Sequence, residues 1–573
     1  MTTDTGVLPD QDDAGERPDG TDDASGRTPP SPGRVRRTAG LLLTVLAFAL
    51  VALVLAAPHD PKALTARWWA RIPLEAQALA VLLLVLRGRA RTWAVRVVGV
   101  LVGLLAALTL LDVGFSLSLN RPFDLVLDWT LLVNAADYLR ATGGTAAVVA
   151  GWAGVVLLAV AVVWLGVAAT RRVAGVLARQ RVRAERVVAA LAVAWLVTAV
   201  LGVDVSPGTP LASAAAAGHV VERAERVDRT LHDLDDYARE LADDRFAAVP
   251  GDRLLTGLRG KDVLLTFVES YGRVAVDDPQ IGPGVAKVLD DGMARLAAQG
   301  YGARSGWLTS STFGGASWLA HSTMLSGTDV DNPQRYRRLL ASDRLTLPTL
   351  FGKAGWTTVG IMPSLDGAWP EERLYGYDRV HQKPDFGYAG PHFGWSPIPD
   401  QYVLAKAQEL ELGAAGRAPV FAELALTSSH APWAPLPKAV PWESLGDGSV
   451  YDPMPAQGFL QSEVWPDPTS VKREYGHSIE YTVQALMSYV ERYGTENTVL
   501  VVLGDHQPLP LVSGVGASRD VPVFVLAKDP AVLDAISGWG WDDGPTPSDR
   551  APVWGMWQFR DRFVGAFSPQ VTP

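Results

Sequence analysis

The chain has 573 residues, 48% of them hydrophobic, and a formal net charge of −10 at pH 7. This length exceeds what one hydrophobic core usually organises, so we expect at least two domains. The negative charge argues against nucleic acid as the main partner. The absence of cysteine excludes disulfides, thiolate metal ligands and a cysteine nucleophile.

Residues 1–37 are rich in Asp, Gly, Pro, Thr and Ser and have hardly any large apolar side chains, which predicts a disordered tail. The tail ends in Arg34, Arg36 and Arg37, directly before the uncharged segment Thr38–Ala57. A signal peptide would have a shorter apolar region and a small-residue cleavage site. We therefore interpret this segment as a first membrane span.

Four further apolar runs follow, and with the first they predict a membrane domain of five spans over residues 38–204. These runs are Ile72–Leu86, Val97–Leu111, Ala146–Thr170 and Val187–Val203. The alternative, buried helices of a soluble core, would require an unusually apolar domain. A transporter is poorly supported because the spans contain few charges, of which Glu75 is one.

Arginine clusters indicate how these spans are oriented. The clusters lie before the first span, between the second and third, and between the fourth and fifth: Arg34, Arg36, Arg37; Arg87, Arg89, Arg91, Arg96; Arg171, Arg172, Arg179, Arg181, Arg183, Arg186. With five spans all three fall on one side, which we expect to be cytoplasmic, together with the tail. The odd number then places residues 205–573 outside the cytoplasm. Residues 205–253 are highly charged, which is typical of a solvated linker helix.

Residues 254–573 have the pattern of an α/β domain with a mostly parallel sheet flanked by helices. Strands are predicted at Val263–Val268, Thr357–Met362, Val420–Leu426, Thr498–Leu503 and Val521–Leu526. The carboxyl ends of such strands form the ligand-binding edge of the sheet. Two of them end in Glu269 and in Asp505-His506, so we expect these side chains to share one metal ion.

The nucleophile candidate is Ser317, in the segment Thr312-Phe-Gly-Gly-Ala-Ser317. Two glycines permit a sharp turn, and an apolar helical pattern begins at once, so the hydroxyl would lie at a helix N-terminus that favours a bound phosphate. The alternative is that Ser317 only caps the helix. Ser311 and Thr312 are rival hydroxyls. His321, one turn further on, either touches the substrate or packs.

Together these segments resemble the alkaline phosphatase/sulfatase superfamily, and specifically its membrane-anchored lipoteichoic acid synthase-like branch. The resemblance implies one divalent ion, most often Mn²⁺ with Zn²⁺ or Mg²⁺ as alternatives, bound by Glu269, Ser317, Asp505 and His506. Ser317 takes the place of the family's threonine, which attacks phosphorus. His430, in Ser-Ser-His430-Ala-Pro-Trp, matches a histidine that contacts the substrate.

The resemblance also implies a headgroup pocket, with Trp369 at the position of a tryptophan that lines it and with His321, Asp366 and Arg373 as expected substrate contacts. The family has an arginine two residues after that tryptophan, whereas this chain has Glu371 there. A carboxylate repels an anionic headgroup, which argues against glycerol phosphate. The chain also lacks the Cys/Ser-x-Pro-x-Arg sequence of the formylglycine sulfatases.

We therefore predict a metal-dependent phosphotransferase with a catalytic domain at residues 254–573. It would move a phospho-alcohol headgroup from a membrane lipid donor to a cell-envelope acceptor through a phospho-serine. A phosphodiesterase, phosphatase or sulfatase-like hydrolase of envelope components is the alternative, because the first half of the reaction is the same. A non-catalytic membrane scaffold on a degenerate fold is a further possibility.

Overall fold

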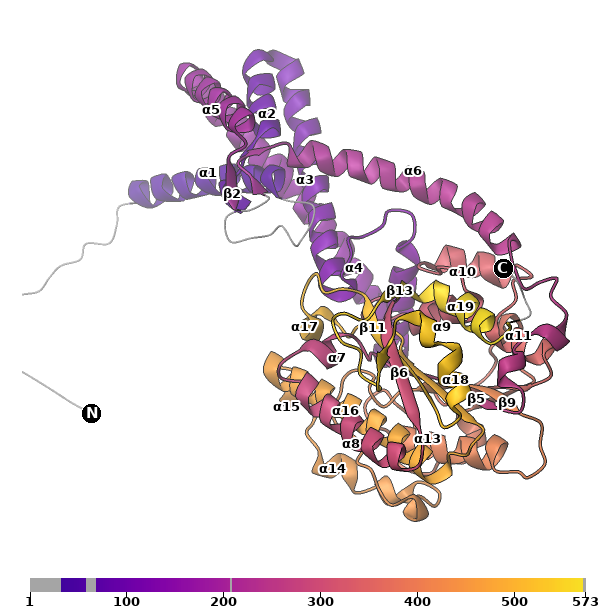
Figure 1. Ribbon diagram of the computed structural model, residues 1–573. Coiled ribbons are helices and arrows are strands. Elements are labelled where there is room, and N and C mark those ends of the chain that lie inside the picture. Colours follow the sequence, from indigo (N-terminus) through magenta and orange to yellow (C-terminus); the bar gives the residue numbers. More distant parts are fainter. Residues whose placement is uncertain (1–31, 58–67, 207–208, 570–573) are drawn as a thin grey trace, which may run out of the picture.

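The computed structural model describes residues 32–57, 68–206 and 209–569, which form a bundle of apolar helices joined to an α/β domain (Figure 1). Most of the predicted disordered tail lies outside these residues. Helix α1 begins at Pro32, before the first predicted span. Proline suits the first turn of a helix because its φ is already helical and its missing N–H has no partner there.

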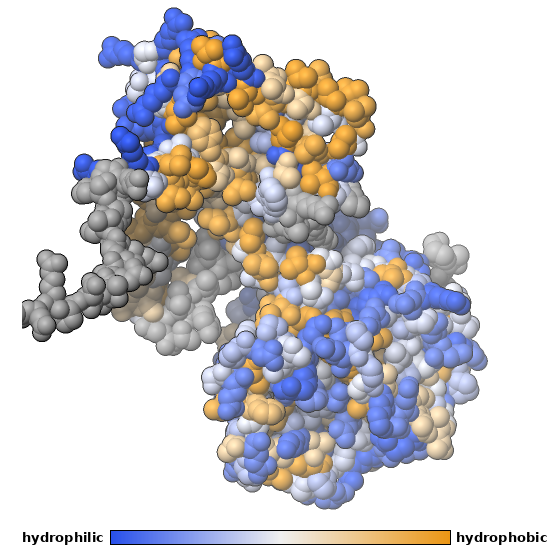
Figure 2. All heavy atoms as spheres, turned by 90° about the vertical axis from the view of Figure 1, so that its left-hand side faces the viewer, coloured by the Kyte–Doolittle hydropathy of each residue, from blue (hydrophilic) through white to orange (hydrophobic). Residues whose placement is uncertain are grey.

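Four helices in the described residues are long and apolar enough to cross a membrane. They lie within α1 (Pro32–Ala56), α3 (Gly88–Leu119), α4 (Trp129–Arg179) and α5 (Arg181–Leu201). The remaining predicted span is α2 (Leu74–Val85), whose 12 residues cover only about 18 Å. Apolar side chains gather on the surface of this bundle, whereas hydrophilic residues dominate the α/β domain (Figure 2).

Hydrogen bonds show which ends of these helices lie together. Arg172, at the end of α4, donates from Nε to Thr44 Oγ1 of α1 at 2.9 Å, and Arg91 of α3 donates to the carbonyl of Ala174. The arginine-bearing ends of α3 and α4 therefore lie together, and that of α4 contacts the first half of α1. At the opposite ends, β1 (Ile72–Pro73), before α2, pairs with β4 (Ala212–Ser213), after α5.

Helix α6 (Ala215–Ala242) follows the bundle and reaches the α/β domain (Figure 1). It is not fully solvated, in contrast to the prediction from its charge pattern. Arg223 is buried, pairs with Asp112 of α3 and donates to the carbonyl of Phe123, which follows that helix. His219, one turn earlier, lies 3.3 Å from the same carboxylate. Charge density alone could not reveal this face because its partner lies about a hundred residues away in the sequence.

The α/β domain is built on a nine-stranded sheet with the order β12-β6-β11-β10-β5-β9-β7-β8, in which β13 pairs with β6. Its strands are β5 (Asp262–Val268), β6 (Gly302–Thr309), β7 (Thr357–Met362), β8 (Arg379–Gln382), β9 (Val420–Leu426), β10 (Thr498–Gly504), β11 (Asp520–Ala527), β12 (Asp542–Asp543) and β13 (Val553–Gly555). Strands β8, β7, β9, β5 and β10 are parallel, whereas β11 runs antiparallel to both of its neighbours. The sheet is therefore mixed, and the predicted parallel arrangement is found from the edge strand β8 to β10, whereas β11 and β12 pair antiparallel with their neighbours.

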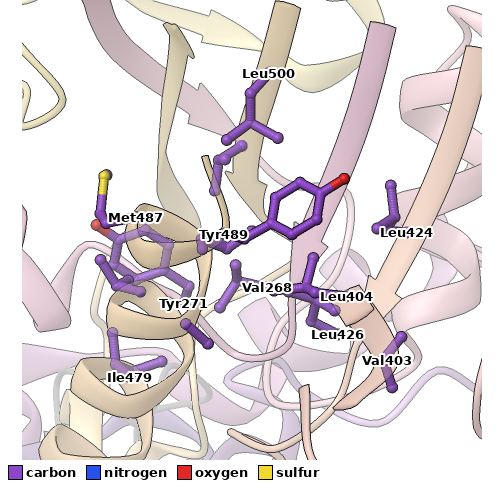
Figure 3. Close-up of a cluster of buried hydrophobic side chains, with 14 of the residues drawn as sticks. Val268, Tyr271, Val403, Leu404, Leu424, Leu426, Ile479, Met487, Tyr489 and Leu500 are labelled. Carbon is purple, nitrogen blue, oxygen red and sulfur yellow. The ribbon is translucent and has the colours of Figure 1, made fainter. Parts of the chain in front are cut away.

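Both faces of the sheet are covered by helices, as the continuous apolar strands require. On one face, Val268, Leu424 and Leu500 pack against Ile479 and Met487 of α16 (Pro468–Tyr493) (Figure 3). The opposite face is covered by α9 (Ser317–Ser326), α11 (Leu347–Lys353) and α19 (Phe559–Ala566). Successive residues of β5 alternate between these two cores, because side chains point to opposite faces along a strand.

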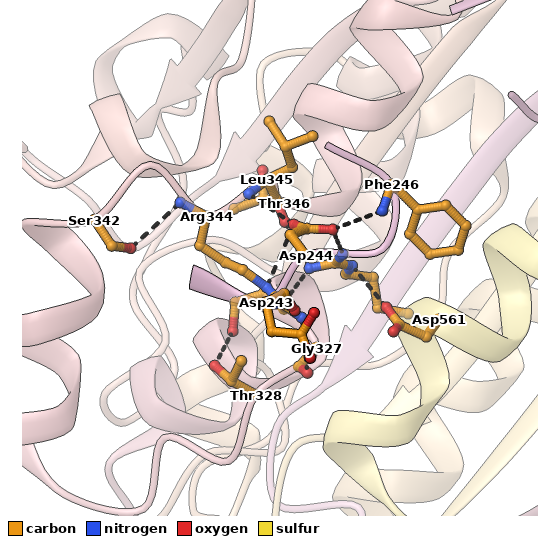
Figure 4. A network of polar contacts seen from close by, with 12 residues as sticks. Asp243, Asp244, Phe246, Gly327, Thr328, Ser342, Arg344, Leu345, Thr346 and Asp561 are labelled. Carbon is orange, nitrogen blue, oxygen red and sulfur yellow. Dashed lines mark hydrogen bonds and ion pairs between the residues drawn. The ribbon is translucent and has the colours of Figure 1, made fainter. Parts of the chain in front are cut away.

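A buried ion network ties α9 to the rest of the domain (Figure 4). Arg560 is fully buried and donates from Nη1 to the carbonyl of Ser326, the last residue of α9, and to that of Leu345 at 2.8 Å. Its Nη2 donates to Asp244 Oδ1 at 2.6 Å, and Arg344 donates from Nε to Ser326 at 3.0 Å. Two cations thus satisfy the carbonyls at the C-terminus of this helix.

Replacing Arg560 with methionine is expected to destabilise the domain by about 3 to 5 kcal/mol, because Asp244 would be left buried with a weaker partner. Thermal unfolding of the purified protein measures this effect. The matched control is Arg562→Met, at an exposed arginine that lies over the ring of Trp554 and should contribute about 0.5 to 1 kcal/mol. Equal melting temperatures for the two variants would contradict the assignment.

Candidate active site

Two neighbouring strand ends form the floor of the site. Strands β5 and β10 are parallel and in register, with Val268 opposite Gly504. The next residues are Glu269 on one strand and Asp505 on the other, so the sheet itself places the two carboxylates side by side. Both side chains, and that of His506, are buried.

Ser317 meets these residues from helix α9. Its Oγ donates to Glu269 Oε2 at 2.9 Å and lies 3.2 Å from His506 Nε2. The same Nε2 is 3.5 Å from Glu269 Oε1 and 3.6 Å from Asp505 Oδ2. Ligand atoms of Glu269, Asp505 and His506 all lie within 4.8 Å of one another. The structure thus brings together the four predicted side chains.

The rival interpretations of this segment find no support. Ser317 is the first helical residue and its side chain makes no capping hydrogen bond; the capping position belongs to Ala316. The hydroxyl of Ser311 accepts a hydrogen bond from Thr323 at 3.0 Å. Thr312 donates to the carbonyl of Gly315. Both rival hydroxyls therefore hold the turn, whereas that of Ser317 faces the carboxylates.

Strained backbone surrounds the site. Five non-glycine residues of the described chain have positive φ, and three of them are Ser270, Ala316 and Trp433, with φ of 57°, 61° and 58°. Ala316 directly precedes the serine, and Ser270 directly follows Glu269. This conformation costs on the order of 1 kcal/mol or more per residue and persists only where the surrounding structure enforces it, often at functional sites.

Two buried carboxylates this close cannot easily ionise together. Asp505 Oδ1 accepts hydrogen bonds from the backbone N–H of Ser270 and of His506, both at 2.7 Å, but Oδ2 is buried without a partner. Burial and the charge of Glu269 raise the pKa of Asp505 well above its usual value. A bound cation would therefore stabilise the two carboxylates.

The donor set fits a divalent metal ion. The Nδ1 of His506 lies 2.8 Å from the carbonyl of Gln507, which can only accept, so Nδ1 has the proton and Nε2 is the ring nitrogen available to a metal ion. With two carboxylates and the serine oxygen this makes an oxygen- and nitrogen-rich set, which suits Mn²⁺, Mg²⁺ or Zn²⁺. Oδ2 of Asp505, which is buried without a hydrogen-bond partner, is available to coordinate the ion.

A cavity of about 410 Å³ opens beside these residues. Six aromatic residues line it: Phe267, Trp318, Tyr336, Trp369, Tyr375 and Trp395. Its polar residues include the serine and carboxylates described above together with His321, Glu423 and His430. Among the described residues, no lysine or arginine lines this cavity, so its fixed charges are acidic.

The two histidines of the cavity are held differently. His430 stacks on Trp395, with ring centroids 4.1 Å apart, and its Nδ1 lies 2.6 Å from the carbonyl of Ala431. His321 stacks on Phe267 at 3.8 Å, and its Nδ1 lies 2.8 Å from Glu423 Oε1. Sequence reasoning missed Glu423. The available signal was that Glu423 is the one charged residue in the otherwise apolar strand β9. A central strand rarely contains a carboxylate that has no partner.

The predicted substrate residues separate into two groups. Trp369, His321 and His430 line the cavity, whereas Arg373 lines a different cavity together with Glu371. The Asp366 side chain is 63% exposed and lies 3.5 Å from Lys383. The arginine is therefore not brought to the site beside the tryptophan.

Neither a known family model nor a curated protein matches this sequence. Several solved structures do match it. The lipoteichoic acid synthase LtaP from Listeria monocytogenes is 16% identical, with 55% of this chain and 74% of that chain covered and a TM-score of 0.36. The Streptococcus pyogenes phosphoglycerol transferase GacH is 12% identical, with 59% and 92% covered and a TM-score of 0.34.

The C-terminal periplasmic domain of EcEptC from Escherichia coli, in complex with Zn, is 11% identical, with 52% and 80% covered and a TM-score of 0.35. A Vibrio parahaemolyticus structure described as an alkaline phosphatase superfamily protein also matches.

Proposed function

We propose that this protein is a metal-dependent phosphotransferase that transfers a phospho-alcohol headgroup from a lipid donor to an envelope acceptor through a phospho-Ser317 intermediate. One observation carries the proposal: a serine hydroxyl on the first turn of a helix lies 2.9 Å from Glu269 and 3.2 Å from His506, within a group that can hold a cation. A hydroxyl in these surroundings can be activated as a nucleophile.

Glu269, Asp505 and His506 would hold the divalent ion, with the Ser317 oxygen as a further ligand. When bound, the ion supplies positive charge that lowers the pKa of the serine hydroxyl and offsets the charge of the phosphate. Ser317 Oγ then bonds to phosphorus as the bond from phosphorus to the donor alcohol breaks. The N-terminus of α9 favours the phosphate oxygens, and His430 is in place to donate a hydrogen bond to one of them.

We propose that the bundle crosses the membrane five times, with α2 as the short crossing, and that the α/β domain lies outside the cytoplasm. The meeting of the arginine clusters at one end of the bundle supports this, because such clusters mark the cytoplasmic side. The pairing of β1 with β4 at the other end supports it too, since it requires α2 to traverse the bundle.

The site lies against the end of membrane helix α3. Asn120, which ends this helix, accepts a hydrogen bond from the backbone N–H of Gly516 at 2.8 Å and donates one to Ala517 at 3.0 Å. A side chain at Gly314, three residues before the nucleophile, would come within 2.8 Å of the carbonyl of Ser118. The nucleophile loop is therefore packed on the bundle, which is where a lipid donor would be presented.

The acidic cavity predicts the charge of the headgroup. A donor with a carboxylate on its headgroup would bring a second negative charge next to Glu269 and Glu423, with no lysine or arginine in the lining to offset it. We expect phosphatidylethanolamine to be used at least about tenfold faster than phosphatidylserine with the same acyl chains, about 1.4 kcal/mol. Release of diacylglycerol in detergent micelles with Mn²⁺ measures both. Equal rates would contradict this prediction.

The direct test of the proposed function is to trap the intermediate. The full-length protein is mixed with Mn²⁺ and phosphatidylethanolamine, quenched in acid and analysed by peptide mass spectrometry. The expected result is a phospho-alcohol ester on the peptide that contains Ser317, together with free diacylglycerol. Product analysis with and without an added alcohol then separates transfer from hydrolysis. Turnover without any covalent adduct on that peptide would overturn the proposal.

A further inference from the structure

The mechanism above leaves one proton without a carrier, and the cavity contains a group built to move it. We propose that His321, positioned by Glu423 and Tyr377, is the general acid that protonates the departing alcohol and the general base that deprotonates the incoming one. This inference rests on the proposed function and adds a catalytic residue and two positioning residues to it.

The placement of His321 relative to Ser317 is the first support. The two residues are four positions apart on α9, so their side chains lie on the same face of the helix, one turn apart. Both line the 410 Å³ cavity. A group bound to the serine oxygen in this cavity has its departing or incoming oxygen within the same space as the imidazole.

The second support is how firmly the imidazole is held. Its ring stacks on Phe267 with an interplanar angle of 15°, and its Nδ1 is held by Glu423 Oε1 at 2.8 Å. The hydroxyl of Tyr377 donates to the other oxygen of that carboxylate. Burial, and then the charge of Glu423, raise the pKa of Tyr377 well above its usual value, so the phenol stays protonated as a donor.

This arrangement orients the ring for proton transfer. Because Nδ1 is occupied by the carboxylate, Nε2 is the ring nitrogen left for the cavity, toward which the side chain is 15% exposed. A buried carboxylate behind an imidazole fixes its orientation and stabilises the imidazolium that forms when Nε2 takes a proton. Glu423 itself is 1% exposed and sits in the middle of β9, so it cannot turn away to solvent.

The other histidine of the cavity lacks this support. His430 has only the neutral carbonyl of Ala431 at its Nδ1. A carbonyl dipole stabilises an imidazolium less than a full negative charge does. We therefore assign proton transfer to His321 and leave His430 with a hydrogen bond to the phosphate.

The two half-reactions balance as follows. In the first, the Ser317 hydroxyl gives its proton to Glu269 Oε2, to which it already donates, and the Oγ–P bond forms. The P–O bond to the donor alcohol breaks, and the proton on Nε2 of His321 moves to the departing alkoxide. In the second, the acceptor hydroxyl gives its proton to Nε2, its oxygen bonds to phosphorus, and the Oγ–P bond breaks as Ser317 Oγ takes its proton back from Glu269. One residue serves both steps because the leaving and entering alcohols use the same face of the phosphorus, one after the other.

The test separates the two halves by the choice of leaving group. Bis(4-nitrophenyl) phosphate releases nitrophenolate, which needs no proton, so the first half should survive His321→Gln while the second slows by about 10²-fold or more. The expected result with full-length protein and Mn²⁺ is a burst of one nitrophenolate per protein and accumulation of phospho-Ser317. With phosphatidylethanolamine, whose alkoxide needs the proton, the same variant should lose turnover without accumulating the intermediate.

Three comparisons complete the experiment. Glu423→Gln keeps the shape but removes the charge, and it should produce the same burst with a smaller loss; Tyr377→Phe should produce a smaller loss still. The matched control is His477→Gln, at a half-exposed histidine on α16 away from the cavity, which should behave as wild type. Metal content and melting temperature show that each variant is folded.

Two outcomes would overturn the assignment of His321. One is a His321→Gln variant with wild-type steady-state rates, and the other is a folded, metal-loaded variant that loses the burst together with turnover. Failure of the proposed function looks different. In that case the wild-type protein itself forms no adduct on Ser317, whichever donor is used.

Discussion

Replacing Ser317 with alanine should lower turnover by on the order of 10⁴-fold or more and remove every trace of a covalent phospho-enzyme, because it removes the hydroxyl that we propose as the nucleophile. The Ser317 oxygen lies 2.9 Å from Glu269 Oε2 and 3.2 Å from His506 Nε2. The measurement is steady-state turnover of phosphatidylethanolamine combined with mass spectrometry of acid-quenched protein. Metal content should change little, because Glu269, Asp505 and His506 remain.

Two further variants make this prediction specific. Ser317→Thr keeps a hydroxyl at the same position and should still form the covalent intermediate. Ser311→Ala removes the rival hydroxyl, which already bonds Thr323, and should leave the intermediate on Ser317. An alanine variant at position 317 with full activity would show that the nucleophile has been assigned wrongly.

Replacing Asp505 with asparagine should reduce bound metal from one ion per protein to none, with a loss of activity on the order of 10³-fold. The variant keeps Oδ1, which accepts two backbone hydrogen bonds, and replaces the unpartnered Oδ2 by an uncharged amide nitrogen. An amide nitrogen is not a metal ligand. Elemental analysis of the purified protein gives the stoichiometry.

The sign of the stability change separates metal loss from misfolding. In chelator, Asp505→Asn should be as stable as wild type or more so, because one of two crowded carboxylates has been removed. Adding Mn²⁺ at a hundred times its Kd should stabilise the wild type by about 2.7 kcal/mol and leave the variant unchanged. A variant that still binds one equivalent of metal would contradict the assignment of this carboxylate.

The core of the candidate site was predictable because its signals are local. A continuous run of apolar residues predicts a buried strand, and a polar residue at its end falls on the sheet edge where ligands bind. Glu269, Asp505 and His506 each follow such a run, and the glycine-rich turn before Ser317 is a local signal of the same kind. Neighbours in the sequence were sufficient for the two carboxylates and the histidine, whereas Ser317 remained open against the capping alternative.

Other elements lacked such a signal. Strand β6 (Gly302–Thr309) was missed because its small and charged residues do not form an apolar run. The antiparallel course of β11 was missed because direction is set by the connection to its neighbours, not by its composition. The predicted span Ile72–Leu86 is longer than helix α2, because the two residues of strand β1 that precede the helix are apolar as well.

The sequence by itself determined the candidate ligand set, the apolar helices and the position of the candidate nucleophile, because each depends on residues that are adjacent in the chain. Only the tertiary structure decided that Glu423 of β9 supports His321 of α9, and that Arg373 lies apart from the cavity that Trp369 lines. These relations depend on how strands and helices pack across long separations. Periodicity within a segment contains no information about which side chain from another segment will meet it.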